Sequence, residues 1–130
     1  MKVLFVCAGN IARSQMAEGF YNHFTDSDNA SSAGIYNFTP EQYEHPVEEV
    51  IEAMKEEGID LSEKKVKSIT KDMVEKSDKV YVLCQKDKCP PFLTDSEKVT
   101  FWGVEDPYGK DMDFMRETRD LIKSKIKSII

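Results

Sequence analysis

The chain begins with an apolar segment that passes into an amphipathic one across a short polar loop. Residues 2–6 have the composition of a buried β-strand, and residues 14–24 carry Met, Ala, Phe and Tyr at helical spacing. The loop between them reads Cys7-Ala-Gly-Asn-Ile-Ala-Arg13-Ser14. This order of strand, loop and helix predicts the first unit of an α/β fold.

The rest of the chain continues to alternate strands with helices. This alternation predicts a parallel sheet covered by helices on both faces, with right-handed crossovers. No repeat or linker divides the sequence, so we expect one domain over residues 1–130. In the last helix, Leu121 and Ile122 are among the apolar residues expected to face the core. We expect further strands at 30–33, 79–83 and 98–101, helices at 47–57, 70–76 and 111–130, and a loop over 36–46.

Charge and hydropathy exclude several classes of function. The formal net charge of −6 argues against general binding of nucleic acid, which needs a basic surface. No segment approaches the roughly 20 apolar residues that span a bilayer, so we expect no membrane association. Met1 and Lys2 lead directly into the first strand without a signal peptide. These features predict a cytoplasmic protein.

Three cysteines are an odd number for a disulfide framework and favour a reducing compartment. Cys84 and Cys89 lack a second Cys or His pair at zinc-finger spacing, and His23 and His45 stand alone. We therefore predict no metal site and no cofactor.

The loop after the first strand has the chemistry of an oxyanion site. Backbone N–H groups at the start of a helix bind anions, and the guanidinium of Arg13 can hold two oxygens of one tetrahedral group. A cysteine in the same positive field ionises more readily, which makes Cys7 a candidate nucleophile; the alternative is an inert, buried cysteine. Ser14 is expected to cap the helix and to donate to the sulfur. The predicted oxyanion-binding residues are Ala8, Gly9, Asn10, Ile11, Ala12, Arg13 and Ser14.

Three polar positions follow the carboxyl ends of different predicted strands. Cys7 ends the first strand, Cys84 follows the third and Asp106 follows the fourth. In an open parallel sheet, sites form beyond these ends, so the three residues are expected at one edge. Asp106 is then a candidate general acid for a departing oxygen, and the alternative is a turn aspartate before Pro107.

Cys7, Arg13 and Ser14, taken with Asp106-Pro-Tyr-Gly109, resemble the low-molecular-weight protein tyrosine phosphatase family. The segments Ser32-Ala-Gly34 and Gly58-Ile-Asp-Leu-Ser62 are also similar to that family. The resemblance covers nearly the whole chain and implies a four-stranded parallel sheet flanked by helices.

Two further features resemble the thioredoxin-coupled arsenate reductase branch of the family: the run Gln15-Met-Ala-Glu18 and the pair Cys84 and Cys89. The resemblance implies that Cys7 attacks arsenate, that Cys84 displaces arsenite from Cys7, and that Cys89 moves the disulfide to the surface for thioredoxin or a similar dithiol donor. A disulfide needs Cα atoms closer than about 7 Å, and an α-helix separates positions five apart by roughly 8–9 Å. The segment 84–89 must therefore be looped or must unwind.

The chain departs from this branch in three ways. The interval between Cys84 and Cys89 is two residues shorter, and Ala12 replaces a cysteine. Some reductases bind potassium near the loop; Asn10, Glu18 and Ser32 match the residues that hold it, but Lys67 stands where an aspartate would be. We expect the lysine to take the place of the cation.

Two other functions stay open. A phosphatase would use Cys7, Arg13 and Asp106, with water in place of Cys84, and Tyr108 favours it because such phosphatases often have tyrosine there. A non-enzymatic anion-binding or redox-sensing module would need the loop without turnover. Asp106 argues against that module, because a sensor needs no acid for a leaving group.

Overall fold

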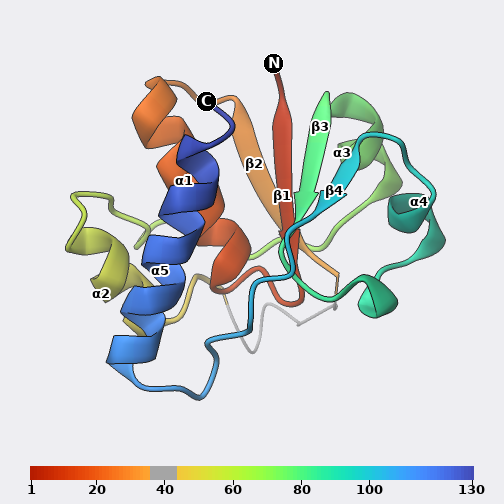
Figure 1. Cartoon of the computed structure of the whole chain (residues 1–130). Helices are drawn as coiled ribbons and strands as arrows, with labels where there is room; N and C mark the ends of the chain where they lie inside the picture. The colour runs from red at the N-terminus through yellow and green to blue at the C-terminus, as the bar shows by residue number, and fades with distance from the viewer. Residues whose placement is uncertain (36–43) are drawn as a thin grey trace.

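Four parallel strands form one sheet in the order β2-β1-β3-β4 in the computed structural model, which describes residues 1–35 and 44–130 (Figure 1). β1 pairs with both β2 and β3, with Val6 opposite Ala33 and Val82, and β3 pairs with β4. The predicted four-stranded parallel sheet is confirmed. The strands are β1 (Val3–Cys7), β2 (Ala30–Gly34), β3 (Lys79–Val82) and β4 (Val99–Phe101).

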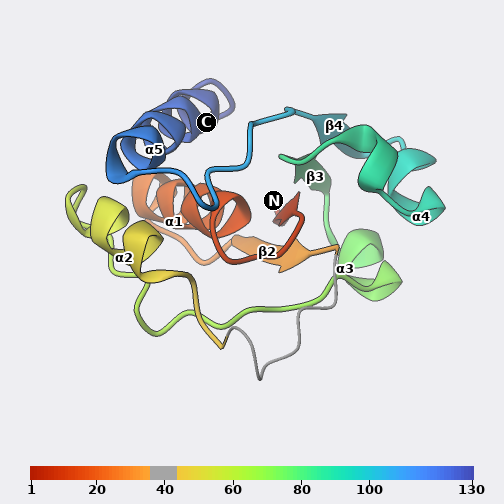
Figure 2. The same cartoon turned by 90° about the horizontal axis from the view of Figure 1, so that it is seen from below.

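Helices cover both faces of the sheet (Figures 1 and 2). α1 (Arg13–Thr25), α2 (Glu48–Lys55) and α5 (Met112–Lys127) lie on one face. α3 (Lys71–Lys76) and α4 (Pro91–Thr94) lie on the other, and the 3-10 helix η1 (Lys86–Lys88) precedes α4. The sequence did not predict η1 and α4, because segments of three or four residues carry no measurable periodicity.

The central strand divides the core into two apolar layers. Phe5 is fully buried and packs with Phe20, Met54 and Ile122 from the helices on the first face. Val6 is also fully buried but belongs to the layer on the second face. Successive strand side chains point to opposite faces, so a strand covered on both sides is apolar throughout, as residues 3–6 are.

The buried face of α5 differs from the prediction at Leu121 and Met115. Ile122 and Ile126 are fully buried as expected, but Leu121 is 47% exposed and the expectation for it is wrong. Met115 is buried instead. At 100° per residue, Leu121 lies beside the stripe that runs through 115, 118, 122 and 126 and not on it.

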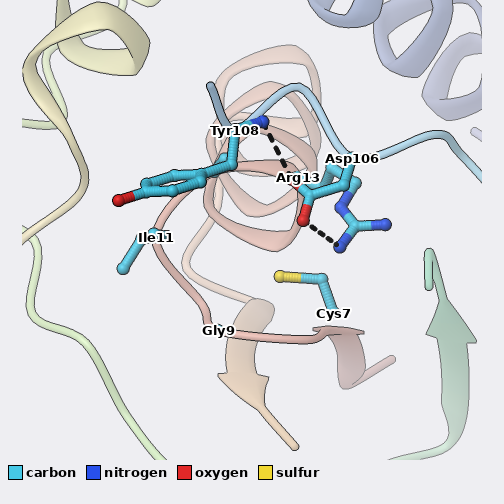
Figure 3. Close-up of a pocket in the computed structure, with 7 residues that line it drawn as sticks. Cys7, Gly9, Ile11, Arg13, Asp106 and Tyr108 are labelled. Carbon is cyan, nitrogen blue, oxygen red and sulfur yellow. Dashed lines mark hydrogen bonds and ion pairs between the residues drawn. The ribbon is translucent and has the colours of Figure 1, made fainter. Parts of the chain in front are cut away.

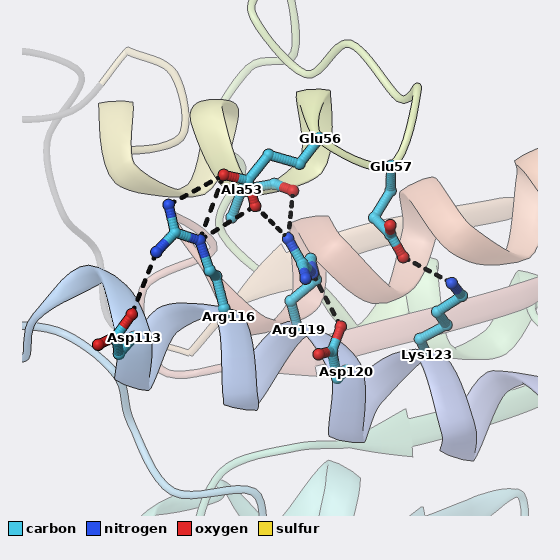
Figure 4. Close-up of polar contacts among 8 residues, drawn as sticks. All are labelled: Ala53, Glu56, Glu57, Asp113, Arg116, Arg119, Asp120 and Lys123. Carbon is cyan, nitrogen blue, oxygen red and sulfur yellow. Dashed lines mark hydrogen bonds and ion pairs between the residues drawn. The ribbon is translucent and has the colours of Figure 1, made fainter.

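Side chains of α5 bind the carboxyl-terminal end of α2 (Figure 4). Arg119 donates to the Ala53 carbonyl at 3.0 Å and to the Glu56 carboxylate at 2.6 Å. Arg116 donates to both oxygens of Glu56 at 3.0–3.2 Å. The hydrogen bonds from Arg116 and Arg119 lower the pKa of Glu56. These contacts hold α2 against α5.

The loop predicted over residues 36–46 falls mostly on residues 36–43, which lie outside the described residues. Within the described part of the chain, no helix is long and apolar enough to cross a membrane.

Candidate active site

The loop from β1 to α1 passes very close to the end of β2. Asn10 adopts a left-handed backbone conformation with φ 58°, as its residue type allows. Gly34 ends β2 beneath the loop, where an added Cβ would lie only 2.7 Å from the Gly9 carbonyl carbon and 2.9 Å from the Asn10 nitrogen. The close approach of backbone to backbone therefore requires a glycine at position 34.

The Cys7 thiol is surrounded by hydrogen-bonding groups of the loop. Its Sγ lies 2.9 Å from the Ser14 hydroxyl and accepts from the Asn10 backbone N–H at 3.3 Å. The sulfur thus has hydrogen-bond contacts with both the backbone of the loop and the first turn of α1. The expectation that Ser14 caps α1 is wrong: the helix begins at Arg13, its N-cap is Ala12, and no side chain caps it. Ser14 lies inside the first turn, where its hydroxyl faces the sulfur.

Arg13 joins the carboxyl ends of two strands to the acid expected from the sequence. Its Nη1 donates to the Leu83 carbonyl at 3.3 Å and to the Val104 carbonyl at 2.8 Å. Its Nη2 lies 3.6 Å from the Asp106 carboxylate, which also accepts from the Tyr108 backbone N–H at 3.0 Å (Figure 3). Of the three residues expected at one edge of the sheet, Cys7 and Asp106 therefore line the same cavity, with Arg13 beside them.

A cavity of about 160 Å³ lies over the Cys7 sulfur. The sulfur points into it from below, Arg13 and Asp106 form one side, and the Tyr108 ring with Ile11 forms another (Figure 3). Of the predicted oxyanion-binding residues, Gly9, Ile11, Ala12 and Arg13 line it. Ala8, Asn10 and Ser14 are not among the lining residues.

The Asn10 side chain is instead buried under the loop in a chain of hydrogen bonds. Its Nδ2 donates to Ser14 at 2.7 Å and to Ser32 at 2.9 Å. The Ser32 hydroxyl donates to the buried Glu18 carboxylate at 2.9 Å, and Lys64 forms an ion pair with Glu18 at 3.1 Å. A continuous polar path thus connects the surface to the nucleophile.

The lysine paired with Glu18 is Lys64, whereas the sequence pointed to Lys67. The Nζ of Lys67 donates to the Lys65 carbonyl at 3.0 Å, and its backbone N–H donates to Asn10 Oδ1 at 2.9 Å. Burial is the main cause that lowers the pKa of Lys67. No group of three or more His, Cys, Asp or Glu within 1–35 and 44–130 is arranged to hold a metal ion.

Cys84 and Cys89 follow β3 at the same edge of the sheet. The backbone N–H of Leu83 still donates to the Val6 carbonyl at 2.7 Å, so Cys84 is the first residue beyond this bond. Cys84 is buried; burial, then the charges of Cys89 and Cys7, raise its pKa to about 12. Cys89 is half-buried, and its thiol lies 3.7 Å from the Gln85 carbonyl. All three thiols are free.

The segment between these two cysteines is not an α-helix. It consists of an extended Gln85 and the short 3-10 helix η1 (Lys86–Lys88), which agrees with the expectation of a looped segment. Cys7 packs in the first apolar layer and Cys84 in the second. A disulfide between Cys7 and Cys84 therefore needs the chain after Leu83 to rotate.

By its fold and its loop, the chain is an α/β protein of the class that holds a cysteine and an arginine in an oxyanion-binding loop at the edge of a parallel sheet. The family model described as low molecular weight phosphotyrosine protein phosphatase matches residues 2–130. The chain belongs to this family.

Relatives within the family carry a more specific name. The chain is 40% identical over 129 residues to arsenate reductase 1 of Staphylococcus saprophyticus, covering 96% of this chain and 92% of that protein. It is 39% identical over 130 residues to the arsenate reductase of Staphylococcus xylosus, covering 97% and 93%.

Solved structures show the same fold. The low molecular weight protein tyrosine phosphatase of T. tengcongensis superposes with a TM-score of 0.83 at 29% identity, covering 99% of this chain and 97% of that one. Wzb of Vibrio vulnificus, solved in complex with benzylphosphonate, gives 0.87 at 20% identity, covering 98% and 95%.

Proposed function

We propose that this protein is an arsenate reductase that works through Cys7, Cys84 and Cys89. The observation that carries the proposal is the buried Cys84, which follows the strand beside Cys7 at the edge where the oxyanion cavity opens. A hydrolase of the same fold needs only Cys7, Arg13 and Asp106. The names of the relatives from Staphylococcus support the same reaction.

In the first step, arsenate occupies the cavity with its oxygens on the loop N–H groups and on Arg13. The Cys7 thiolate attacks the arsenic and forms a sulfur–arsenic bond. Asp106 gives a proton to the departing hydroxide, which leaves as water. The position of Asp106 beside Arg13, open to the cavity, suits this role.

In the second step, Cys84 attacks the sulfur of Cys7. The sulfur–arsenic bond breaks, its electron pair leaves with arsenite, and a disulfide between Cys7 and Cys84 remains. Cys89 then attacks Cys84, which frees Cys7 and transfers the disulfide to the pair Cys84 and Cys89. Cys89 is the more exposed of the two, so the final disulfide is accessible to an external reductant.

The reductant that we propose is thioredoxin or a similar dithiol donor. The relay starts from three free thiols, which suits the reducing cytoplasm. Residues 1–130 would act as one domain, without a metal or an organic cofactor.

The test is a coupled assay with reduced protein, arsenate, thioredoxin, thioredoxin reductase and NADPH. Wild type is expected to sustain NADPH oxidation, whereas Cys89→Ser releases at most one arsenite per chain and then stops. Cys7→Ser is the control that should show neither event. Turnover of Cys89→Ser at the wild-type rate would show that the three-cysteine relay is wrong.

A second candidate is hydrolysis of aryl phosphates, which one specific observation favours. The Tyr108 ring and Ile11 form an apolar wall of the cavity beside the sulfur (Figure 3). Such a wall suits the flat ring of a phenyl phosphate. A phosphatase would hydrolyse para-nitrophenyl phosphate equally well as wild type and as Cys89→Ser, without any oxidation of NADPH.

A further inference from the structure

Two peptide groups of the oxyanion loop are held by backbone hydrogen bonds from residues that do not line the cavity. The Ile11 carbonyl accepts from the Val47 N–H at 3.2 Å, and the Ala12 carbonyl accepts from the Met16 N–H at 3.0 Å. The C=O and N–H of a trans peptide point in opposite directions. The N–H groups of Ala12 and Arg13 are therefore turned towards the cavity, which both residues line.

The peptide between Asn10 and Ile11 is held in a different way, by the side chain of Gln15. Gln15 Nε2 donates to the Asn10 carbonyl at 3.2 Å, to Asn10 Oδ1 at 3.1 Å and to the Lys65 carbonyl at 3.0 Å. A backbone carbonyl only accepts, so the atom that faces two of them is the amide nitrogen. The Ile11 N–H, on the other side of the same peptide, is thereby directed at the cavity that Ile11 lines.

Gln15 is completely buried, and the oxygen of its amide is not used. Gln15 Oε1 has no hydrogen-bond partner among the described residues. Burying an unpaired carbonyl oxygen costs free energy, so an apolar side chain would fill this space at a lower cost. The amide at position 15 is therefore explained by its N–H donors, through the bonds to Asn10 and Lys65.

We infer that Gln15 is a positioning residue for oxyanion binding: it fixes the peptide between Asn10 and Ile11 so that the Ile11 N–H is available to the anion. Gln15 acts through this peptide and does not line the cavity itself. Its role rests on the oxyanion loop of the proposed function and adds a residue that no step of the relay uses.

A substitution at position 15 should act on this one peptide. The backbone N–H of Lys67 also donates to Asn10 Oδ1, at 2.9 Å, and Asn10 Nδ2 donates to Ser14 and Ser32. The Asn10 side chain therefore keeps these partners when Gln15 is replaced, whereas the Asn10 carbonyl loses its bond to the amide.

The test measures the binding of inorganic phosphate to the reduced protein by calorimetry. Gln15→Met removes the N–H donors and keeps a side chain of similar length. Because one N–H of the loop is no longer directed at the anion, phosphate should bind about tenfold more weakly. In the coupled assay, KM for arsenate should rise by a similar factor, while kcat changes by less than about twofold.

Backbone amide resonances separate the positioning of one peptide from a general loosening of the loop. In ¹⁵N-labelled wild type, saturating phosphate should shift the amide signals of both Ile11 and Ala12. In Gln15→Met, the Ile11 shift should be largely lost, whereas the Ala12 shift should persist because the Val47 backbone holds its peptide. Equal losses at Ile11 and Ala12, or an unchanged affinity for phosphate, would contradict the role of Gln15.

Asn22→Leu is the matched control, because Asn22 is another amide of α1 that binds backbone groups. Its Nδ2 donates to the Ala30 carbonyl at 3.1 Å, and its Oδ1 accepts from the Ala30 N–H at 2.9 Å. This variant should lower the melting temperature and leave the affinity for phosphate unchanged. Gln15→Glu is a second variant in case Gln15→Met destabilises α1; it keeps the shape, replaces the donors by an oxygen and should weaken phosphate binding at least as much.

Arsenite release is measured on the same preparations, so that the role of Gln15 and the proposed function fail separately. If wild type releases arsenite and Gln15→Met binds phosphate as tightly as wild type, the role of Gln15 is wrong and the proposed function stands. If Gln15→Met loses affinity as expected but wild type releases no arsenite, the proposed reaction is wrong and the role of Gln15 stands. If wild type does not bind phosphate, the loop is not an oxyanion site and both fail.

Discussion

Gly34 determines how closely β2 approaches the oxyanion loop. A methyl group at this position would overlap the backbone of Gly9 and Asn10. We expect Gly34→Ala to shift the loop, to destabilise the fold by about 1–3 kcal/mol and to reduce activity strongly. Thermal unfolding and the coupled arsenate assay measure the two effects.

Ser31→Ala is the control for Gly34→Ala, because Ser31 lies on the same strand with an exposed side chain. Ser31→Ala should leave the stability and the activity near the wild-type values. Unchanged activity in Gly34→Ala would mean that the loop tolerates a displacement.

Cys84 makes the second step of the proposed relay dependent on pH. Its pKa is raised to about 12, mainly by burial, so at neutral pH it is almost entirely a thiol. Because the thiolate is the nucleophile, arsenite release in a single turnover should rise by about tenfold per pH unit until another step limits it. Rapid-quench measurement between about pH 6 and 9 would test this. A flat profile would contradict the assignment of Cys84 as the attacking thiol.

At the scale of elements, α2 connects the oxyanion loop to α5. The residue before α2, Val47, donates its backbone N–H to the Ile11 carbonyl of the oxyanion loop at 3.2 Å. The ends of α2 are thus joined to the loop on one side and to Arg116 and Arg119 on the other. The position of α2 therefore contributes to the shape of the cavity.

This arrangement predicts that Glu56→Gln lowers the melting temperature at neutral pH. The folded state lowers the pKa of Glu56 below its ordinary value of 4.5. The stabilisation is therefore complete above that value and is lost as the pH falls through the lowered pKa. The difference in melting temperature between wild type and variant should shrink in acid.

Asp113→Asn is the control for Glu56→Gln. Asp113 pairs with the same Arg116, but its side chain is 88% exposed, so its removal should change the melting temperature little. Equal decreases in melting temperature in the two variants would show that the contact between α2 and α5 stabilises the protein no more than an exposed ion pair does.

At the scale of the whole molecule, one polar path joins the loop around Lys64 to the nucleophile. It runs from Lys64 through Glu18, Ser32 and Asn10 to the Ser14 hydroxyl beside Cys7. Glu18 and Ser14 lie in α1, Ser32 in β2 and Asn10 in the oxyanion loop, so the path depends on how these three elements pack together.

We expect Lys64→Met to remove the ion-pair partner of the buried Glu18 carboxylate. The free energy of unfolding should fall by about 1–3 kcal/mol, less than for a fully buried pair because Lys64 is partly exposed. Activity should fall as well. Chemical denaturation and the steady-state assay measure these losses. Lys64→Arg should retain most of the stability and most of the activity. Lys65→Met should change neither, because Lys65 contributes its backbone carbonyl to these hydrogen bonds and not its side chain. A fully active Lys64→Met would show that the path has no role in positioning Cys7.

Local patterns in the sequence predicted the strands, the longer helices and the residues that we propose for the first step. Hydrophobic periodicity predicted the parallel sheet and its main helices, because a strand buried on both faces and an amphipathic helix leave distinct patterns. The composition of the loop pointed to Cys7 and Arg13, because the backbone and charge requirements of an oxyanion site are local. Asp106 and Cys84 followed from the rule that sites form at the carboxyl ends of parallel strands.

Only the tertiary structure decided which groups meet across elements. It placed Lys64 rather than Lys67 on Glu18, left the start of α1 without the cap expected from Ser14, and exposed Leu121. These outcomes depend on how elements distant in sequence pack and which rotamers the packing permits, and no local pattern records that. The loop between β1 and α1 is thus readable from the sequence, whereas the surroundings that position its cysteine are a property of the assembled sheet.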